Sequence, residues 1–228
     1  HYDGLYEQSI YFDQALSRYF MRKGWNISQF SILRSLSELL IQKILVERYP
    51  DLQCQQTSCH AAHKEGERIH PCGRCEKCRR IVGMLTALGA DPLQCGYSAS
   101  QIQGALEKFP REGVLQEAAG ACHLHFMLAQ KGLIDTSELP NKAIEAHPEI
   151  LKCRIDLKSS PISSIPSDLR KPLYRLFLKY ADGAVLRSGP SWKKIDVLKD
   201  PVIDAPYPFE FDPIAADNRD NHSLKPLG

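Results

Sequence analysis

The segment Pro71-Cys72-Gly73-Arg74-Cys75-Glu76-Lys77-Cys78 spaces three cysteines three residues apart, and Cys59 precedes them across a polar loop. Zinc prefers four ligands in a tetrahedron, and thiolates are its usual structural ligands. A Cys-Gly-x-Cys turn lets two sulfurs converge on one ion, and Gly73 relieves the steric strain of that turn. Cys78 falls in the first turn of the next helix, whose positive N-terminus favours the thiolate. We therefore predict one structural zinc ion, with no open position for catalysis, bound by Cys59, Cys72, Cys75 and Cys78.

Two alternatives to this zinc site remain open. The same spacing occurs around iron–sulfur clusters, although such runs usually end in Cys-Pro, whereas Cys78 is followed by Arg79-Arg80. The other alternative concerns the fourth ligand, because thiol and imidazole side chains surround Cys59 in the sequence: Cys54, His60, His63 and His70. A thiolate is the preferred structural ligand, and His63 or His70 is the strongest replacement for it.

The composition is that of an ordinary globular protein, with 43% hydrophobic and 25% charged residues among 228. No apolar run approaches the roughly 20 residues that a membrane span needs, so no membrane association is expected. Five of the eight cysteines lie within residues 54–78, which favours metal-bound thiolates and a reducing cytoplasm over a disulfide framework. The net charge of +2 restricts nucleic-acid binding to a local basic patch, for which the candidates are Arg74, Lys77, Arg79 and Arg80.

Hydrophobic periodicity predicts a mainly α-helical chain around this zinc loop. Helices are expected at 7–23, 36–47, 76–88, 100–109, 113–131 and 167–180, and a strand at 151–157. Ser35-Leu36-Ser37-Glu38 has the form of a capping box, and Gly89 stands where a helix C-cap belongs. Residues 51–75 contain too few apolar side chains to pack by themselves, so a metal must order them.

Apolar stripes mark the helix faces that we expect to be buried. The first helix carries Phe12, Leu16, Tyr19 and Phe20, and the last carries Leu169, Leu173, Phe177 and Tyr180. Cys95, Cys122 and Cys153 are expected to be small buried apolar residues. His123 and His125 point away from each other on a helix, so they cannot share a metal ion.

The cysteine segment from Ser58-Cys59 to Cys78-Arg79, followed by Ala87-Leu88-Gly89-Ala90-Asp91-Pro92, resembles the zinc region of the QueC-like family. These proteins, the 7-cyano-7-deazaguanine synthases, are PP-loop ATP pyrophosphatases. The resemblance covers about residues 3–92. It implies that residues 1–92 are the C-terminal part of a Rossmann-like α/β PP-loop fold of the adenine nucleotide α-hydrolase kind. Residues 93–188 are then expected to form a helical extension, and residues 189–228 a proline-rich irregular tail.

The resemblance implies an ATP-dependent carbon–nitrogen ligase, in which a substrate is adenylated with release of pyrophosphate and then attacked by a nitrogen nucleophile. The family's phosphate loop, Ser-Gly-Gly-x-Asp-Ser, is not found in this sequence, and Ser188-Gly189-Pro190-Ser191 lacks one of the amides needed to replace it. Tyr6-Glu7-Gln8 stands where the family has Tyr-Pro-Asp. We therefore expect ATP, magnesium and the small-molecule substrate to bind only when an N-terminal half outside this chain is also present. This chain alone is expected to be inactive.

A binding module is the main alternative to this ligase. In that interpretation a zinc-stabilised helical domain grips nucleic acid or protein through the basic residues around the metal loop, without catalysis. The interpretation that we favour for these basic residues is a solvated face that balances the charge of four thiolates. A third hypothesis is an interaction protein that uses the helices of residues 93–180, and a homo-oligomer is left open. The sequence identifies no catalytic base or nucleophile.

Overall fold

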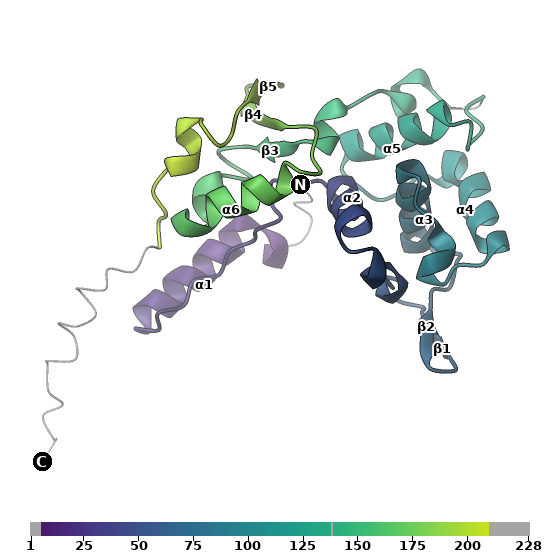
Figure 1. The fold of residues 1–228 in the computed structure, drawn as a ribbon, viewed down its shortest axis with the longest axis horizontal. Helices are drawn as coiled ribbons and strands as arrows, with labels where there is room; N and C mark the ends of the chain where they lie inside the picture. Colours follow the sequence, from purple (N-terminus) through teal and green to yellow (C-terminus); the bar gives the residue numbers. More distant parts are fainter. Residues whose placement is uncertain (1–5, 138, 210–228) are drawn as a thin grey trace, which may run out of the picture.

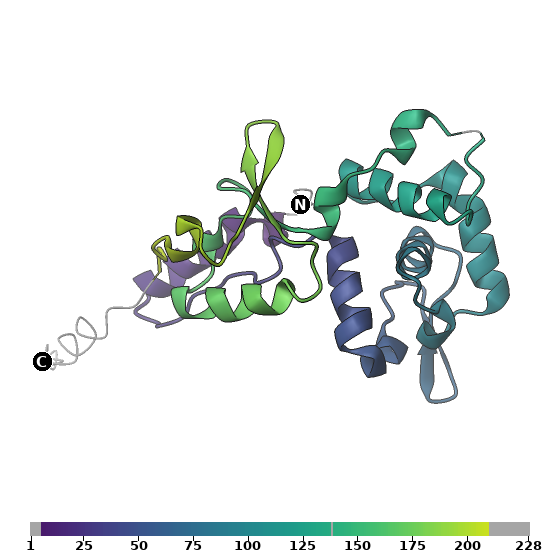
Figure 2. The ribbon, with the colours of Figure 1, turned by 45° about the horizontal axis from the view of Figure 1, so that its top comes forward.

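The computed structural model describes residues 6–137 and 139–209, which form two lobes on either side of helix α2 (Glu38–Arg48) (Figures 1 and 2). Each lobe has its own cluster of buried apolar side chains. The neighbouring residues Leu39 and Leu40 of α2 belong to different clusters, so this helix ties the lobes together. We call them the metal lobe, which contains the cysteine loop, and the sheet lobe.

The metal lobe is helical and is built around α3. Its elements after α2 are β1 (His63–Glu65), β2 (Arg68–His70), α3 (Glu76–Leu88), α4 (Ala99–Glu112) and α5 (Ala118–Gln130). Most side chains of α3 are buried, and the helix lies between its neighbours in Figure 2. At Gly83 a Cβ atom would stand 2.4 Å from the Phe109 ring, so glycine permits the close approach of α3 and α4. The helix predicted at residues 76–88 is confirmed, with Gly89 as its left-handed C-cap.

The sheet lobe packs helices against a small mixed sheet. Its elements are α1 (Ile10–Arg22), β3 (Cys153–Ile155), α6 (Ser167–Phe177), β4 (Ala184–Ser188) and β5 (Ser191–Ile195). The strand order is β3-β4-β5, with β3 parallel to β4 and β4 antiparallel to β5. Cys153 lies opposite Ala184, and Arg187 lies opposite Trp192. Helices α1 and α6 lie side by side in both views (Figures 1 and 2).

Short 3-10 helices join the longer elements: η1 (Tyr6–Gln8), η2 (Pro50–Gln55), η3 (Pro92–Cys95), η4 (Asn141–Ile144), η5 (Pro148–Leu151), η6 (Ile162–Ser164) and η7 (Pro201–Asp204). Within the described part of the chain, every helix is too short or too polar to cross a lipid bilayer.

Several predicted boundaries were wrong. Helix α2 begins at Glu38, and Ser37 rather than Ser35 caps it, because the Ser37 hydroxyl accepts the Leu40 N–H at 3.0 Å. Helix α5 begins at Ala118, five residues later than predicted. The predicted irregular tail contains β5 and η7, since β5 finds a partner in β4 that is close in sequence. Residues 210–228 of that tail lie outside the described residues.

The predicted mainly helical architecture with a four-cysteine loop agrees with the structure, which adds a small sheet. The described residues form a two-stranded and a three-stranded sheet and no doubly wound parallel sheet. A Rossmann-like fold therefore stays a prediction, as do segment boundaries at residues 92 and 188. The cluster of the metal lobe nevertheless combines residues from both sides of position 92, from Leu39 to Ile150.

The buried faces of two helices differ from the apolar stripes predicted for them. In α1 the buried residues are Ile10, Asp13 and Ser17, while Tyr19 of the predicted stripe is 48% exposed. In α6 they are Arg170, Tyr174 and Phe177, while Leu169 is 38% exposed. Phe177 is thus the member of the predicted α6 stripe that is fully buried. Polar side chains occupy both buried faces because other segments supply hydrogen-bond partners for them.

Candidate metal centre

The metal loop, residues 71–75, connects the hairpin β1–β2 to the first turn of α3. After β2 the chain turns at Gly73, whose φ of +69° is the left-handed conformation that side chains rarely adopt. In this turn the backbone N–H groups of Arg74 and Cys75 point toward the Cys72 sulfur. The backbone N–H group of Gly73 points toward the Cys78 sulfur. The local sequence thus pre-forms a site for thiolates.

The sulfur atoms of Cys59, Cys72, Cys75 and Cys78 all lie within 4.8 Å of one another. Cys75 Sγ is 3.6 Å from Cys59 Sγ and 3.5 Å from Cys78 Sγ, and Cys72 Sγ is 3.8 Å from Cys78 Sγ. With zinc–sulfur bonds of about 2.3 Å, the edge of a regular tetrahedron is about 3.8 Å. The sulfurs of a disulfide are only about 2.05 Å apart. The cluster has the spacing to hold one metal ion such as zinc.

The surroundings of Cys72, Cys75 and Cys78 shift their pKa values. Burial raises the pKa of Cys75 and of Cys78. Burial also acts to raise the pKa of Cys72. Hydrogen bonds from the N–H groups of Arg74 and Cys75 and from the Cys59 thiol outweigh burial, and they lower the pKa of Cys72 to about 6. Four thiolates at this spacing repel one another, so a divalent cation is what stabilises the fully ionised set.

Two side chains outside the sulfur group pack against the cysteine turn. Tyr97 is 4% exposed, and its side chain hydrogen-bonds with Cys78 from the metal lobe's interior. A Cβ atom on Gly73 would stand 2.3 Å from the Gln101 side chain, which closes the capping box at the start of α4. Sequence reasoning missed Tyr97 and Gln101, because their contact with the cysteine turn depends on how α4 packs on α3.

The alternative ligands stay outside the sulfur group. His63 and His70 pair across the hairpin with ring centroids 6.1 Å apart, and neither belongs to the group of candidate ligands in the described residues. Cys54 is exposed and also lies outside the group. In an iron–sulfur cluster the thiolates are distributed over several iron atoms, so sulfurs in mutual contact favour a single ion. Cys59 is therefore the fourth member of the sulfur group, and its role as the fourth metal ligand stays a prediction.

The remaining cysteines and histidines have structural surroundings. Cys95 and Cys153 are buried as predicted, at 1% and 0% exposure, whereas Cys122 is half-buried. His125 Nδ1 lies 2.8 Å from the Ala121 carbonyl oxygen of its own helix. His123 Nδ1 accepts the His147 N–H at 3.1 Å. The two histidines thus face different partners and do not share a candidate metal site among the described residues.

Half of the predicted basic patch is turned inward. Arg79 is 6% exposed and donates from Nε to the Gly113 carbonyl at 2.7 Å, and it also pairs with Glu112. Arg80 lies between Glu38 and Glu76. Lys77 Nζ contacts His60 Nε2 at 2.7 Å, and Arg74 is exposed. The local surface is therefore less basic than the sequence suggests.

A cavity of about 960 Å³ opens beside the metal loop, where three helices begin. Apolar side chains form much of its wall, and we call it the polar cavity after the carboxylates that also line it. Glu38, Glu76 and Glu117 line it from the first turns or caps of α2, α3 and α5, where a carboxylate complements the helix dipole. Arg80 Nε stands 3.4 Å from Glu38 and 3.8 Å from Glu76. Asp13 of α1, paired with Arg34, reaches the cavity from the sheet lobe.

The sequence did not reveal this cavity. Burial raises the pKa of Glu38, with Arg80 acting in the opposite direction. The one signal available beforehand was an acidic residue near the start of each helix, which is common at ordinary helix termini. No family model, curated protein or solved structure matches this chain.

Proposed function

We propose that the chain binds one zinc ion through Cys59, Cys72, Cys75 and Cys78, and that this ion has a structural role. The proposal is carried by the contacts among the sulfur atoms, which match the edges of a zinc tetrathiolate tetrahedron. Four protein ligands leave no position for a substrate or water. Zinc would fix the hairpin and the start of α3, and through α3 the wall of the polar cavity.

Metal analysis tests this proposal directly. The protein purified under reducing conditions is expected to contain one zinc ion per chain and four sulfur neighbours at about 2.3 Å by X-ray absorption spectroscopy. Cys54→Ser serves as the matched control, because Cys54 is exposed and outside the sulfur group. It should retain full zinc, whereas Cys59→Ser should lose tight binding. Iron with iron–iron scattering, or full zinc retention by Cys59→Ser, would contradict the assignment.

We further propose that this domain serves a QueC-like PP-loop ligase that joins carbon to nitrogen at the expense of ATP. The resemblance of the segment from Ser58 to Pro92 supports this. The cavity provides a place for a small-molecule substrate, since Glu76, Lys77 and Arg80 reach it from the helix that carries Cys78. ATP and magnesium would bind to a Ser-Gly-Gly-x-Asp-Ser loop, a motif that these 228 residues do not include.

The proposal that the ATP site lies outside this chain can be measured. The zinc-loaded chain, incubated with magnesium ATP, is expected to release no AMP above a protein-free blank, because it has no phosphate loop. Chromatography of the nucleotides measures this. AMP release that follows the protein through two purification steps and falls with Arg80→Met would place the ATP chemistry inside this chain. That result would contradict the role proposed for this chain.

A further inference from the structure

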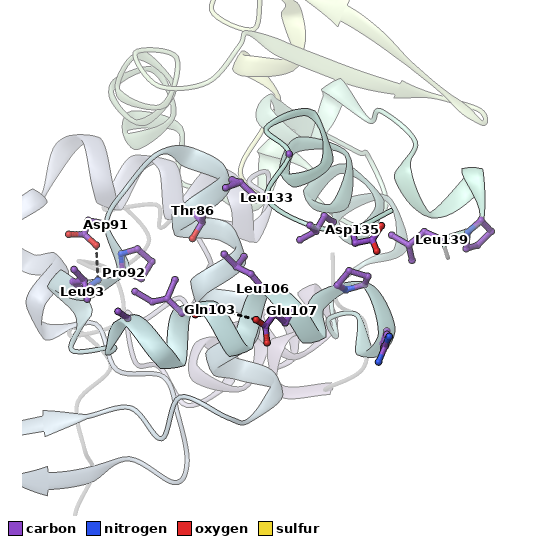
Figure 3. A pocket seen from close by; sticks show the side chains of 17 residues that line it. Thr86, Asp91, Pro92, Leu93, Gln103, Leu106, Glu107, Leu133, Asp135 and Leu139 are labelled. Atoms are coloured by element: carbon purple, nitrogen blue, oxygen red, sulfur yellow. Dashed lines mark hydrogen bonds between the residues drawn. The ribbon is translucent and has the colours of Figure 1, made fainter. Parts of the chain in front are cut away.

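A groove of about 1300 Å³ lies on the far part of the metal lobe, formed by α4, the end of α3 and the segment after α5 (Figure 3). Its apolar lining includes Pro92, Leu93, Ile102, Leu106, Leu133 and Ile134. Leu93 and Leu133 are 53% and 37% exposed. The described residues therefore leave a set of large apolar side chains accessible in one concave surface.

Charges along this groove are predominantly acidic. The lining residues include three carboxylates, those of Asp91, Glu107 and Asp135, and one guanidinium, that of Arg111. Figure 3 shows Asp91 and Asp135 toward opposite ends, with Leu106 between them. The Ser137 N–H and side chain, and then Arg111, hold the pKa of Asp135 below its usual range. The described lining residues thus carry an excess of two negative charges at neutral pH.

We propose that the groove docks an amphipathic helix of a partner protein, with an apolar stripe facing the groove and lysine or arginine on its flanks. Small-molecule pockets usually measure about 300–1,000 Å³, so this groove has room for several side chains. Apolar residues at helical spacing would contact the leucines, in the manner of other helix-binding grooves. The carboxylates attract cationic flanks and repel a polyanion, which argues against nucleic acid here.

This docking surface goes beyond the zinc and ligase proposals, because none of its lining residues contributes to the sulfur group or the polar cavity. The probe is a fluorescein-labelled helical peptide of about 16 residues, roughly four turns, with leucines at helical spacing and lysines on the flanks. One control peptide has glutamates in place of the lysines, and another has the same composition in scrambled order. Fluorescence anisotropy measures binding to the zinc-loaded chain.

The lysine peptide is expected to bind saturably in the micromolar range, and both control peptides at least about tenfold more weakly. Leu93→Ser and Glu107→Lys should each weaken binding by about tenfold. Glu107 accepts a hydrogen bond from Gln103 of its own helix, so its replacement removes no long-range contact from the described structure. The matched controls Leu157→Ser and Glu67→Lys change exposed residues outside the groove and should leave binding unchanged.

Three outcomes would overturn this inference. Equal binding of the lysine and glutamate peptides would remove the electrostatic argument. Unchanged affinity in both Leu93→Ser and Glu107→Lys would place the peptide elsewhere on the protein. Finally, if sedimentation shows that the chain self-associates and that Leu93→Ser restores the monomer, a second copy occupies the groove and no separate partner is needed.

Discussion

Chelation of the proposed zinc ion is expected to unfold the metal lobe while the sheet lobe keeps its structure. Cys59 and Cys78 are buried members of the metal lobe's core, so loss of the ion leaves repelling or unpaired thiols inside it. Zinc binding in small zinc domains contributes about 10–16 kcal/mol, which is comparable to the whole stability of a typical domain, about 5–15 kcal/mol. The core of the sheet lobe contains no described residue between Ile44 and Cys153. It therefore does not depend directly on the loop.

Hydrogen exchange with mass spectrometry separates the two lobes in one experiment. After chelation, amides of α3 should exchange at least about 100-fold faster, equivalent to about 2.7 kcal/mol of lost local stability, and zinc should restore their protection. Amides of β3 and β4 should change little. The two tryptophans, Trp25 and Trp192, lie beside α1 and on β5, so their fluorescence should also stay constant.

Cysteine variants provide the matched comparison for this experiment. Cys78→Ser should behave like the chelated protein even in excess zinc, because Cys78 is fully buried and cannot be replaced by a water-exposed ligand. Cys54→Ser should behave like the wild type. Slow exchange throughout α3 in the metal-free protein would show that helix packing alone holds the lobe, and would remove the structural role assigned to the ion.

The four members of the sulfur group could be predicted from the sequence because most of them are local. Three of the four lie within residues 71–78, where a turn and a helix start bring the sulfurs together whatever the rest of the fold does. The fourth, Cys59, was preferred over the nearby histidines because thiolates are the usual structural ligands of zinc. Helix α3 was predicted with its observed limits for a related reason, since Cys75 and Gly89 mark its ends.

The buried faces of α1 and α6 could not be predicted in this way, because a periodicity argument assumes that buried faces are apolar. Ser17 of α1 is fully buried and exchanges two hydrogen bonds with the backbone of Gln29. Asp13, one turn earlier, pairs with Arg34. These partners come from the segment after the helix, and their position depends on the tertiary fold. The polar cavity and the acidic groove were missed for the same reason.

Replacing Arg170 with methionine is expected to destabilise the sheet lobe and leave the metal site intact. Arg170 is the largest fully buried side chain among the described residues, at 0% exposure. Hydrophobic periodicity predicts instead that apolar residues such as leucine form the buried face of this helix. Its Nε donates to the Ile165 carbonyl at 2.7 Å, and its guanidinium reaches further carbonyls of Ser163, Ile203 and Ala205. One side chain thus joins α6 to the segments of η6 and η7.

Methionine fills a similar volume but donates no hydrogen bond, so the carbonyls are left buried without this partner, at a cost of about 1–3 kcal/mol each. A total loss of at least about 3–5 kcal/mol is expected, because several buried carbonyls lose their donor at once. Arg170→Lys should also be destabilised, because an ammonium group cannot reproduce the planar fork of donors. Arg175→Met on the exposed side of the same helix should change the stability by less than about 0.5 kcal/mol.

Urea unfolding followed by tryptophan fluorescence measures this loss in the sheet lobe, and bound zinc measured on the same samples reports the metal lobe. The expected result is a lower urea midpoint for Arg170→Met with one zinc ion still bound. A midpoint within the error of Arg175→Met would show that the carbonyls find other donors, and that the buried guanidinium does not hold the lobe together. Loss of zinc together with the lower midpoint would instead show that the lobes unfold as one unit, because Leu39 and Leu40 on α2 couple their two cores.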